Sequence, residues 1–176
     1  MKKTAKEWFL LLDIIYDRRS VRKYQDKPVP KEALEEVLRA GMYAPSAMDC
    51  RPWHFVVLQK REDLAFIQSV HPYSNMLSSA PACILVCADS KRCCPGYFPE
   101  DCAAATQNIL LAAKCLGLDT CWLGVYPAGE RLQPLAERFG LPEGMLPFSL
   151  IAIGYGGEEK KRPERFDPEK IHYDRW

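Results

Sequence analysis

The chain has 176 residues, of which 48% are apolar and 27% are charged. This composition allows one domain to bury a sizeable core without help from disulfides or metal ions. Lysine and arginine together number 24, against 23 for aspartate and glutamate, which leaves a net charge of +1. Because positive and negative charges are so nearly equal in number, the protein has no broad positive field. This argues against nucleic acid and membrane surfaces as partners.

The N-terminal segment, Met1–Asp13, carries three lysines ahead of a short apolar run at Trp8–Leu12. The run is shorter than the roughly 7–15 residues of a signal-peptide core, and no small-residue cleavage site follows it. We therefore expect an amphipathic first helix. Because no stretch approaches the roughly 18 uncharged apolar residues of a membrane span, we expect a soluble, cytoplasmic protein.

The next segments predict a helix and then three strands. Pro30–Ala40 has apolar residues at helical spacing and charged residues outward, which predicts a surface helix that ends at Gly41. Strands are predicted at His54–Gln59, Ala82–Ala88 and Phe148–Tyr155. The last two are nearly continuous apolar runs, so we expect helices to cover the sheet on both faces.

The segment Asp101–Leu116 is apolar almost all round, with Gly117 in the position of a C-terminal cap. A helix without a polar face must be buried on every side. It is therefore either a central core helix or a helix packed against a second subunit. We expect both, which makes dimerisation part of the structure.

The cysteines are numerous for a chain of this length. None are spaced C-x-x-C, and the three histidines lie far apart, so the usual zinc patterns are missing. Several cysteines lie inside apolar runs, where a reduced thiol behaves as a small hydrophobe. We favour free, buried thiols; a metal or cluster site and disulfides remain alternatives, and Cys93-Cys94 is the pair of most interest. The full set is Cys50, Cys83, Cys87, Cys93, Cys94, Cys102, Cys115 and Cys121.

The motifs of several large enzyme classes are missing from the sequence. It contains no G-x-G-x-x-G, G-x-x-x-x-G-K-[ST], G-x-S-x-G or H-E-x-x-H pattern. The sequence therefore indicates no dinucleotide fingerprint, phosphate loop, hydrolase nucleophile or zinc-protease site.

Two basic clusters lie near opposite ends of the chain, at Arg18–Lys23 and Lys160–Arg165. Guanidinium groups bind phosphate through paired hydrogen bonds, so the two clusters could meet around one phosphate group. The alternative is that both are solvated charge runs.

Two further segments have the character of ligand-binding loops. In Tyr43–Trp53, Pro45 and Pro52 fix the backbone and leave Ser46 and the neighbouring amides free to bond a planar ligand. In Cys121–Pro127, a glycine lies where the backbone could closely approach a ligand. The alternatives are an ordinary loop and a strand with a bulge.

Taken in order, these segments resemble the nitroreductase family of flavoproteins. The resemblance runs from about Ile14 to Trp176, and although each motif is loose, five of them occur in the right order. The matching segments are Arg18–Tyr24, Ala44–Ser46 with Pro52–Val57, Asp101–Asn108, Gly117–Gly124, and Arg165 followed by His172 and Trp176.

The resemblance implies an α+β fold with a central mixed, mainly antiparallel sheet flanked by helices. It implies a single FMN-binding domain over residues 1–176. It also implies an intertwined homodimer with two FMN sites at the interface between the subunits.

The resemblance further assigns four groups of residues to FMN. The ribityl phosphate and the pyrimidine side of the flavin would be bound by Arg18, Arg19, Ser20 and Arg22. One face of the ring would be lined, from the other subunit, by Pro45, Ser46 and Ala47. Flavin N5 and O4 would lie near Leu123, Gly124 and the amide of Val125. The phosphate would be closed off by Arg165, helped by Lys161 or Arg162.

Two departures from the family pattern concern the loop after Ser46. Many relatives have Asn where this chain has Asp49, and Gln where it has Arg51. An ionised carboxylate only accepts hydrogen bonds, so Asp49 could contact the flavin N3–H but not O2. The chain is also short for the family, which reduces the insertion over the active site to about Lys91–Pro99. Tyr97 or Phe98 would then cap the flavin and line the substrate site.

The implied activity is transfer of hydride from NADH or NADPH, through flavin N5, to small oxidised acceptors such as nitroaromatics or quinones, by a ping-pong mechanism. Because the cofactor carries this chemistry, no protein acid or base is assigned. Amide donors near N5 and a positive charge from Arg22 or Lys23 would stabilise the reduced flavin.

Three other functions stay open at this point. The chain could be a non-enzymatic flavin-binding or storage protein with the same FMN site. It could be a cysteine-based redox or metal sensor without flavin. Within the family, it could be a specialised dehalogenase or ring-fragmenting enzyme.

Overall fold

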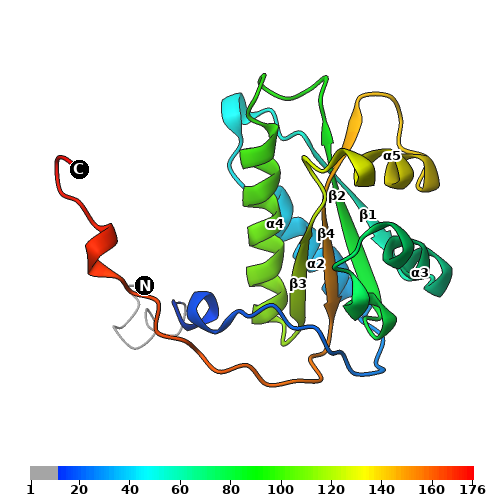
Figure 1. Ribbon diagram of the computed structural model, residues 1–176, viewed down its shortest axis with the longest axis horizontal. Helices are drawn as coiled ribbons and strands as arrows, with labels where there is room; N and C mark the ends of the chain where they lie inside the picture. The colour runs from blue at the N-terminus through cyan, green and yellow to red at the C-terminus, as the bar shows by residue number, and fades with distance from the viewer. Residues whose placement is uncertain (1–11) are drawn as a thin grey trace.

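A four-stranded sheet lies between two layers of helices in the computed structural model, which describes residues 12–176 (Figure 1). The strands lie in the order β1-β2-β4-β3, and every neighbouring pair is antiparallel. Within residues 12–176 the only parallel pairing is an isolated bridge between Ser20 and Thr120. The bounds are β1 (Trp53–Leu58), β2 (Ala82–Asp89), β3 (Asp119–Gly124) and β4 (Met145–Gly154).

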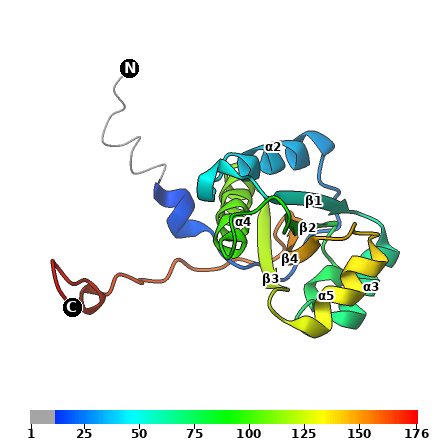
Figure 2. The ribbon, with the colours of Figure 1, turned by 90° about the horizontal axis from the view of Figure 1, so that it is seen from above.

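Each face of the sheet is covered by two helices (Figures 1 and 2). One layer consists of α2 (Lys31–Met42) and α4 (Phe98–Cys115), and the other of α3 (Arg61–Val70) and α5 (Gly129–Arg138). The expected α+β fold, with a mainly antiparallel sheet flanked by helices, is confirmed. The amphipathic helix predicted within Met1–Asp13 lies almost entirely outside the described residues, which begin in a short helix over 12–17.

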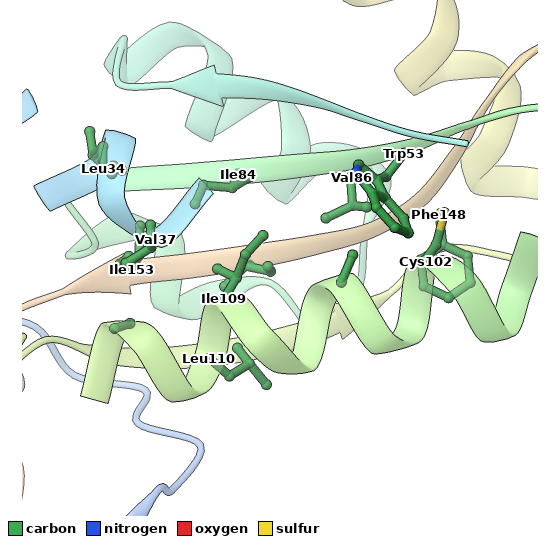
Figure 3. Packing of buried hydrophobic residues seen from close by; sticks show 14 of the residues in the cluster. Leu34, Val37, Trp53, Ile84, Val86, Cys102, Ile109, Leu110, Phe148 and Ile153 are labelled. Atoms are coloured by element: carbon green, nitrogen blue, oxygen red, sulfur yellow. The ribbon is translucent and has the colours of Figure 1, made fainter. Parts of the chain in front are cut away.

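Both hydrophobic cores are built around β2. Its first seven residues are buried, and alternate side chains point to opposite faces of the sheet. Ile84 and Val86 therefore face the core beneath α2 and α4, while Cys83 and Leu85 face the core beneath α3 and α5. Figure 3 shows the first of these cores, where Ile109 of α4 lies against the sheet.

The strand predictions are correct in place but not in every boundary. The strand expected at His54–Gln59 begins at Trp53, and the one expected at Phe148–Tyr155 begins at Met145. The early start of β4 lies beside an irregularity in β2, between Val86 and Cys87, where the register shifts. A shift in register breaks the alternation on which a sequence-based boundary rests.

Gly41 was expected to end the first surface helix, and this expectation is wrong. Gly41 lies inside the last turn of α2 and is buried. A Cβ atom added to it would lie 2.8 Å from Ile109 Cγ1 and 3.3 Å from the ring of Phe55. The glycine is therefore a site of close helix packing, where α2 crosses α4.

Within one chain α4 is buried on one face, and the expected packing of its other face against a second subunit stays a prediction. Ile109 and Leu110 are buried in the core of this chain, whereas Gln107 and Leu111 are partly exposed. Gly117 follows the helix with a φ of +71°, as expected of a C-terminal cap. In the part of the chain that the structure describes, no helix is both long and apolar enough to cross a membrane.

The eight cysteines are free thiols, as we favoured from the sequence. Cys83, Cys87, Cys102 and Cys121 are buried, and the Cys93-Cys94 pair is partly exposed. Burial raises the pKa of the Cys83 and Cys87 thiols to about 12. These thiols therefore stay protonated and act as packing residues of the core.

We expect Gly41→Ala to destabilise the protein by about 1–3 kcal/mol, because the added methyl group must displace Ile109. Helix propensity alone predicts the opposite sign, a gain of about 0.5–1 kcal/mol. Urea denaturation followed by circular dichroism measures the difference. The matched control is Gly129→Ala at the start of α5, where an added Cβ meets no atom within 4 Å. A Gly41→Ala variant as stable as this control would contradict the packing argument.

Candidate functional site

The free edge of β3 is the centre of the candidate site. β3 pairs with β4 on one side only, so every second residue turns its backbone N–H and C=O away from the sheet. The carbonyl of Thr120 accepts from the Val21 amide at 3.0 Å, and the carbonyl of Gly124 accepts from two side chains described below. Trp122 lies midway between them, so its backbone groups face the same open edge.

The segments around Tyr24 and Gly156 run side by side past this edge. Tyr24 pairs with Gly156 in an isolated bridge, and the Gly157 amide donates to the carbonyl of Lys23 at 2.8 Å. The Arg22 amide donates to Glu158 Oε1 at 2.6 Å. These bonds bring the two basic clusters together, as the sequence suggested.

Four arginines from the two clusters line one pocket of about 680 Å³. They are joined there by Gln107 of α4. Burial lowers the pKa of Arg18, and the charges of Arg19 and Arg165 lower this pKa further. Several positive charges forced together in a partly buried pocket favour a bound anion. The four arginines are Arg18, Arg19, Arg162 and Arg165.

The four arginines of the pocket differ in the partners that they already have within the chain. Arg19 donates to the carbonyls of Tyr16, Arg18 and Lys161. Arg162 pairs with Asp13 at 2.8 Å. By contrast, neither Arg18 nor Arg165 has a carboxylate within ion-pair distance among residues 12–176. Arg18 and Arg165 are therefore the arginines best placed to bind an added anion.

Lys161 and Ser20 do not line this pocket. Lys161 contributes its carbonyl to Arg19, and its ammonium group is not part of the pocket wall. Ser20 lies in the bridge to Thr120 at the start of β3. Their assigned contacts to a phosphate stay predictions.

A second pocket, of about 590 Å³, lies at the other end of β3. Three predicted site residues line it: Arg22, Leu123 and Gly124. Cys121 and Trp122 of β3 line it too, and both belong to the segment that the sequence analysis singled out. The sequence analysis missed the others, which come from the connection between α3 and β2 and from the first turn of α5. They include His71, Tyr73, Asn75 and Arg131. The polar and aromatic run His71–Asn75 beside a buried strand was the available signal.

Gly124 offers an open approach to its backbone, whereas Val125 does not. A Cβ added to Gly124 would meet no atom within 4 Å. The Val125 amide instead donates to the carbonyl of Phe148 at 3.2 Å, and its side chain is fully buried. The assignment of the Val125 amide to a ligand is therefore corrected, because that amide already has a partner within the chain.

The loop around Ser46 is held by its own hydrogen bonds. The Ala47 amide donates to Asp101 Oδ1 at 2.8 Å, and Ser46 Oγ accepts from the Arg51 amide at 3.0 Å. The expectation that Ser46 and its neighbouring amides are free is thus wrong for the Ala47 amide. The Ser46 hydroxyl keeps its proton as a donor. Pro45 is exposed beside them.

The two residues that depart from the family pattern bind each other. Arg51 Nη2 lies 2.6 Å from Asp49 Oδ2, and the hydrogen bond from Arg51 lowers the pKa of Asp49. Met48, Asp49 and Arg51 all have positive φ angles, between 49° and 55°. A left-handed backbone at three residues other than glycine is strained. The ion pair bridges two of these strained residues.

Tyr97 and Phe98 lie at the start of α4, one turn before Asp101. Tyr97 is 54% exposed, whereas Phe98 packs edge-to-face against Tyr126 with ring centroids 5.0 Å apart. Neither lines the two pockets beside β3. Asp101 Oδ2 is buried without a hydrogen-bond partner among residues 12–176. The first turns of α4 therefore connect the proposed cap to the loop around Ser46.

Known proteins of one family resemble the chain along most of its length. The sequence profile of the nitroreductase family matches residues 15–74 and 68–155. Over 167 residues the chain is 47% identical to a Methanothermobacter thermautotrophicus protein that carries the provisional name NADH dehydrogenase/NAD(P)H nitroreductase; the match covers 94% of this chain and 87% of the relative.

Two solved structures extend the comparison. A protein of Bacteroides thetaiotaomicron with the same provisional name superimposes with a TM-score of 0.91 at 42% identity, covering 95% of this chain and 98% of its own. A provisionally named nitroreductase of Desulfovibrio desulfuricans, solved in complex with FMN, gives a TM-score of 0.81 at 27% identity and covers 99% of each chain.

Proposed function

The chain belongs to the nitroreductase family, and on that premise we propose that it is an FMN-dependent oxidoreductase that takes electrons from NADH or NADPH. Its acceptors would be small oxidised molecules such as nitroaromatics or quinones. The observation that carries the proposal is the meeting of arginines from both ends of the chain beside the open edge of β3.

The arginine pocket fits the phosphate of a mononucleotide. Arg18 and Arg165 are brought close together without a carboxylate partner among the described residues, so an added dianion would relieve their mutual repulsion. The chain also has no glycine-rich dinucleotide fingerprint, which favours FMN over FAD. Arg19 would support this site indirectly, by fixing the backbone of the two basic segments.

The pocket at the end of β3 fits a planar ring with polar edges. Gly124 leaves room for close approach, and the outward backbone groups of Trp122 suit the alternating donors and acceptors of a flavin. Arg22 lines this pocket and would place a positive charge near the ring.

When bound, FMN would supply the redox chemistry by accepting hydride from the nicotinamide donor at N5 and passing it to the acceptor. The chain binds and orients the cofactor and supplies no acid or base of its own. Arginine charge beside the ring stabilises the negative charge that the flavin gains on reduction. We infer a ping-pong sequence, in which donor and acceptor use the same exposed face in turn.

A second copy of the chain would complete each site. The loop Pro45–Asp49 shares no lining residue with either pocket beside β3, so in one chain it does not face the proposed flavin position. Beyond Phe166, the last residue that lines the arginine pocket, the C-terminal segment leaves the body of the protein as an arm (Figures 1 and 2). Tyr173 and Trp176 on this arm are 84% and 100% exposed. We propose that the arm packs on the partner subunit and that the partner's loop lines the flavin.

The experiment that tests the function begins with the visible spectrum of the purified protein. We expect absorption near 450 nm. Denaturation should release FMN, at about one per chain. NADH or NADPH should bleach the bound flavin, and a quinone should restore its colour. Release of FAD, or no flavin uptake on reconstitution with FMN, would contradict the proposal. Bound FMN without turnover would instead indicate a storage protein.

We expect Arg165→Ala to weaken FMN binding about 10- to 100-fold, because a charge-assisted hydrogen bond to phosphate contributes about 1.5–3 kcal/mol. Lys160→Ala is the matched control, since Lys160 pairs with Glu158 at 3.0 Å and lies outside the arginine pocket. Fluorescence titration of the apoprotein with FMN measures both affinities. Equal affinities would place the C-terminal phosphate contact elsewhere.

We expect Leu111→Glu to disrupt the dimer and lower FMN affinity, while the monomer stays folded. Leu111 is partly exposed on α4 and lies outside the hydrophobic cores of the chain. Its neighbour Leu110 is only 3% exposed, so a charge at Leu110 should unfold the chain and cannot test the interface. Sedimentation velocity together with circular dichroism separates these outcomes. A Leu111→Glu variant that remains dimeric would place the interface away from this face of α4.

A further inference from the structure

The carbonyl of Gly124 is held by two side chains that have no place in the flavin assignment so far. His71 Nε2 lies 2.9 Å from this oxygen, and Arg131 Nη1 donates to the same oxygen at 3.0 Å. His71 directly follows α3, and Arg131 lies in the first turn of α5. Because a carbonyl oxygen has two lone pairs, these two donors satisfy it completely.

The His71 ring has one orientation available to it. The Tyr73 amide donates to His71 Nδ1 at 3.3 Å, so the ring proton lies on Nε2, which donates to Gly124. The residue is 2% exposed, and its own carbonyl accepts from Ser74 Oγ at 2.6 Å. Rotation of the ring would break the bonds at both nitrogens.

The other end of the same peptide group is also fixed. The Val125 amide donates to the carbonyl of Phe148 at 3.2 Å, on the β4 side of the strand. The Gly124–Val125 peptide is therefore held by β4 through its N–H and by the α3–α5 layer through its oxygen. A peptide held from both sides fixes the position of the Gly124 Cα atom.

This restraint matters because Gly124 has no side chain of its own to fix its backbone. It is the last residue of β3, and it is exposed. A Cβ atom added to it would have no other atom of the chain within 4 Å. Glycine has the widest range of backbone conformations of any residue. Without the two side-chain donors, a glycine at the end of an edge strand would sample several orientations.

We propose that His71 and Arg131 are positioning residues for the flavin ring, acting through the backbone of Gly124. This inference rests on the proposed function and deepens it. Preorganised backbone groups bind a ligand without the cost of ordering them, and side chains that orient such groups contribute to affinity indirectly.

Arg131 has a second effect, through its charge. Its side chain is 17% exposed and lines the same pocket as Arg22. Its nearest carboxylate, Glu130, lies 3.5 Å from Nε but is 71% exposed, so water screens that pair. Arg131 therefore adds positive potential where the ring would gain negative charge on reduction.

Four variants test the proposal. His71→Leu replaces the donor by an apolar side chain of similar size. His71→Gln instead provides an amide N–H donor near the position of Nε2. Arg131→Met removes both the donor and the charge. Arg138→Met is the matched control on the same helix. Arg138 lies over the ring of Phe66, as Arg131 lies over the ring of Tyr73, and it pairs with Asp63 but lines a different groove.

Two measurements apply to each variant: the FMN dissociation constant of the apoprotein, by fluorescence titration, and the midpoint potential of the bound flavin. We expect His71→Leu and Arg131→Met to raise the dissociation constant about 5- to 10-fold. His71→Gln should return it to within about twofold of wild type. Arg131→Met should weaken reduced FMN about tenfold more than oxidised FMN, which lowers the two-electron midpoint potential by about 30 mV. Arg138→Met should change neither quantity.

The outcomes separate this inference from the proposed function. If the wild-type apoprotein binds no FMN, the proposed function fails and the inference fails with it. If the wild type binds FMN and His71→Leu and Arg131→Met bind it equally well, only the inference fails. An effect of Arg138→Met equal to that of Arg131→Met, or no recovery in His71→Gln, would also overturn it, because general loosening of the α3–α5 layer would then explain the losses.

Discussion

An edge strand must find partners for the backbone groups that its sheet leaves unpaired, and the arrangement of this protein follows from how β3 meets that requirement. At Thr120 the partner is the N-terminal basic segment, through the Val21 amide. At Gly124 the partners are His71 and Arg131. Between them, the outward groups of Trp122 are left for a ligand. The same edge thus carries the arginines that we propose as the phosphate site at one end and the open glycine at the other.

The helix α4 connects parts of the proposed site that are distant in sequence. Its first turns carry Phe98 and Asp101, and Asp101 anchors the strained loop at Ala47. Farther along, Gln107 reaches the arginine pocket. In the proposed dimer the loop serves the partner's flavin while the pocket serves the chain's own. One rigid helix would then set the spacing between two neighbouring sites, which explains why folding, assembly and cofactor binding should depend on one another.

Misassigned residues show what sequence patterns do not contain. The sequence suggested a free Ala47 amide and a ligand-facing Val125 amide, yet Asp101 and Phe148 bind these groups from 54 and 23 residues away. It suggested that the first surface helix ends at Gly41, because a glycine commonly follows the last residue of a helical pattern. In each case a contact from a distant element decided the outcome, and no local pattern encodes such a contact. His71 and Arg131 were missed for the same reason.

The sequence by itself determined three of the strands, the helices α2 and α4, and the family. Periodicity is a local property, so the apolar run of β2 and the helical spacing of α2 and α4 could be recognised without a structure. The order of the motifs predicted that the basic clusters, the loop at Ser46 and the glycine of β3 belong to one cofactor site. The tertiary structure alone decided which donors and acceptors are already paired, because hydrogen bonds reach only about 3 Å and the partners come from separate elements. That pairing separates Arg18 and Arg165 from the other arginines of their pocket, and it gives His71 a role at Gly124.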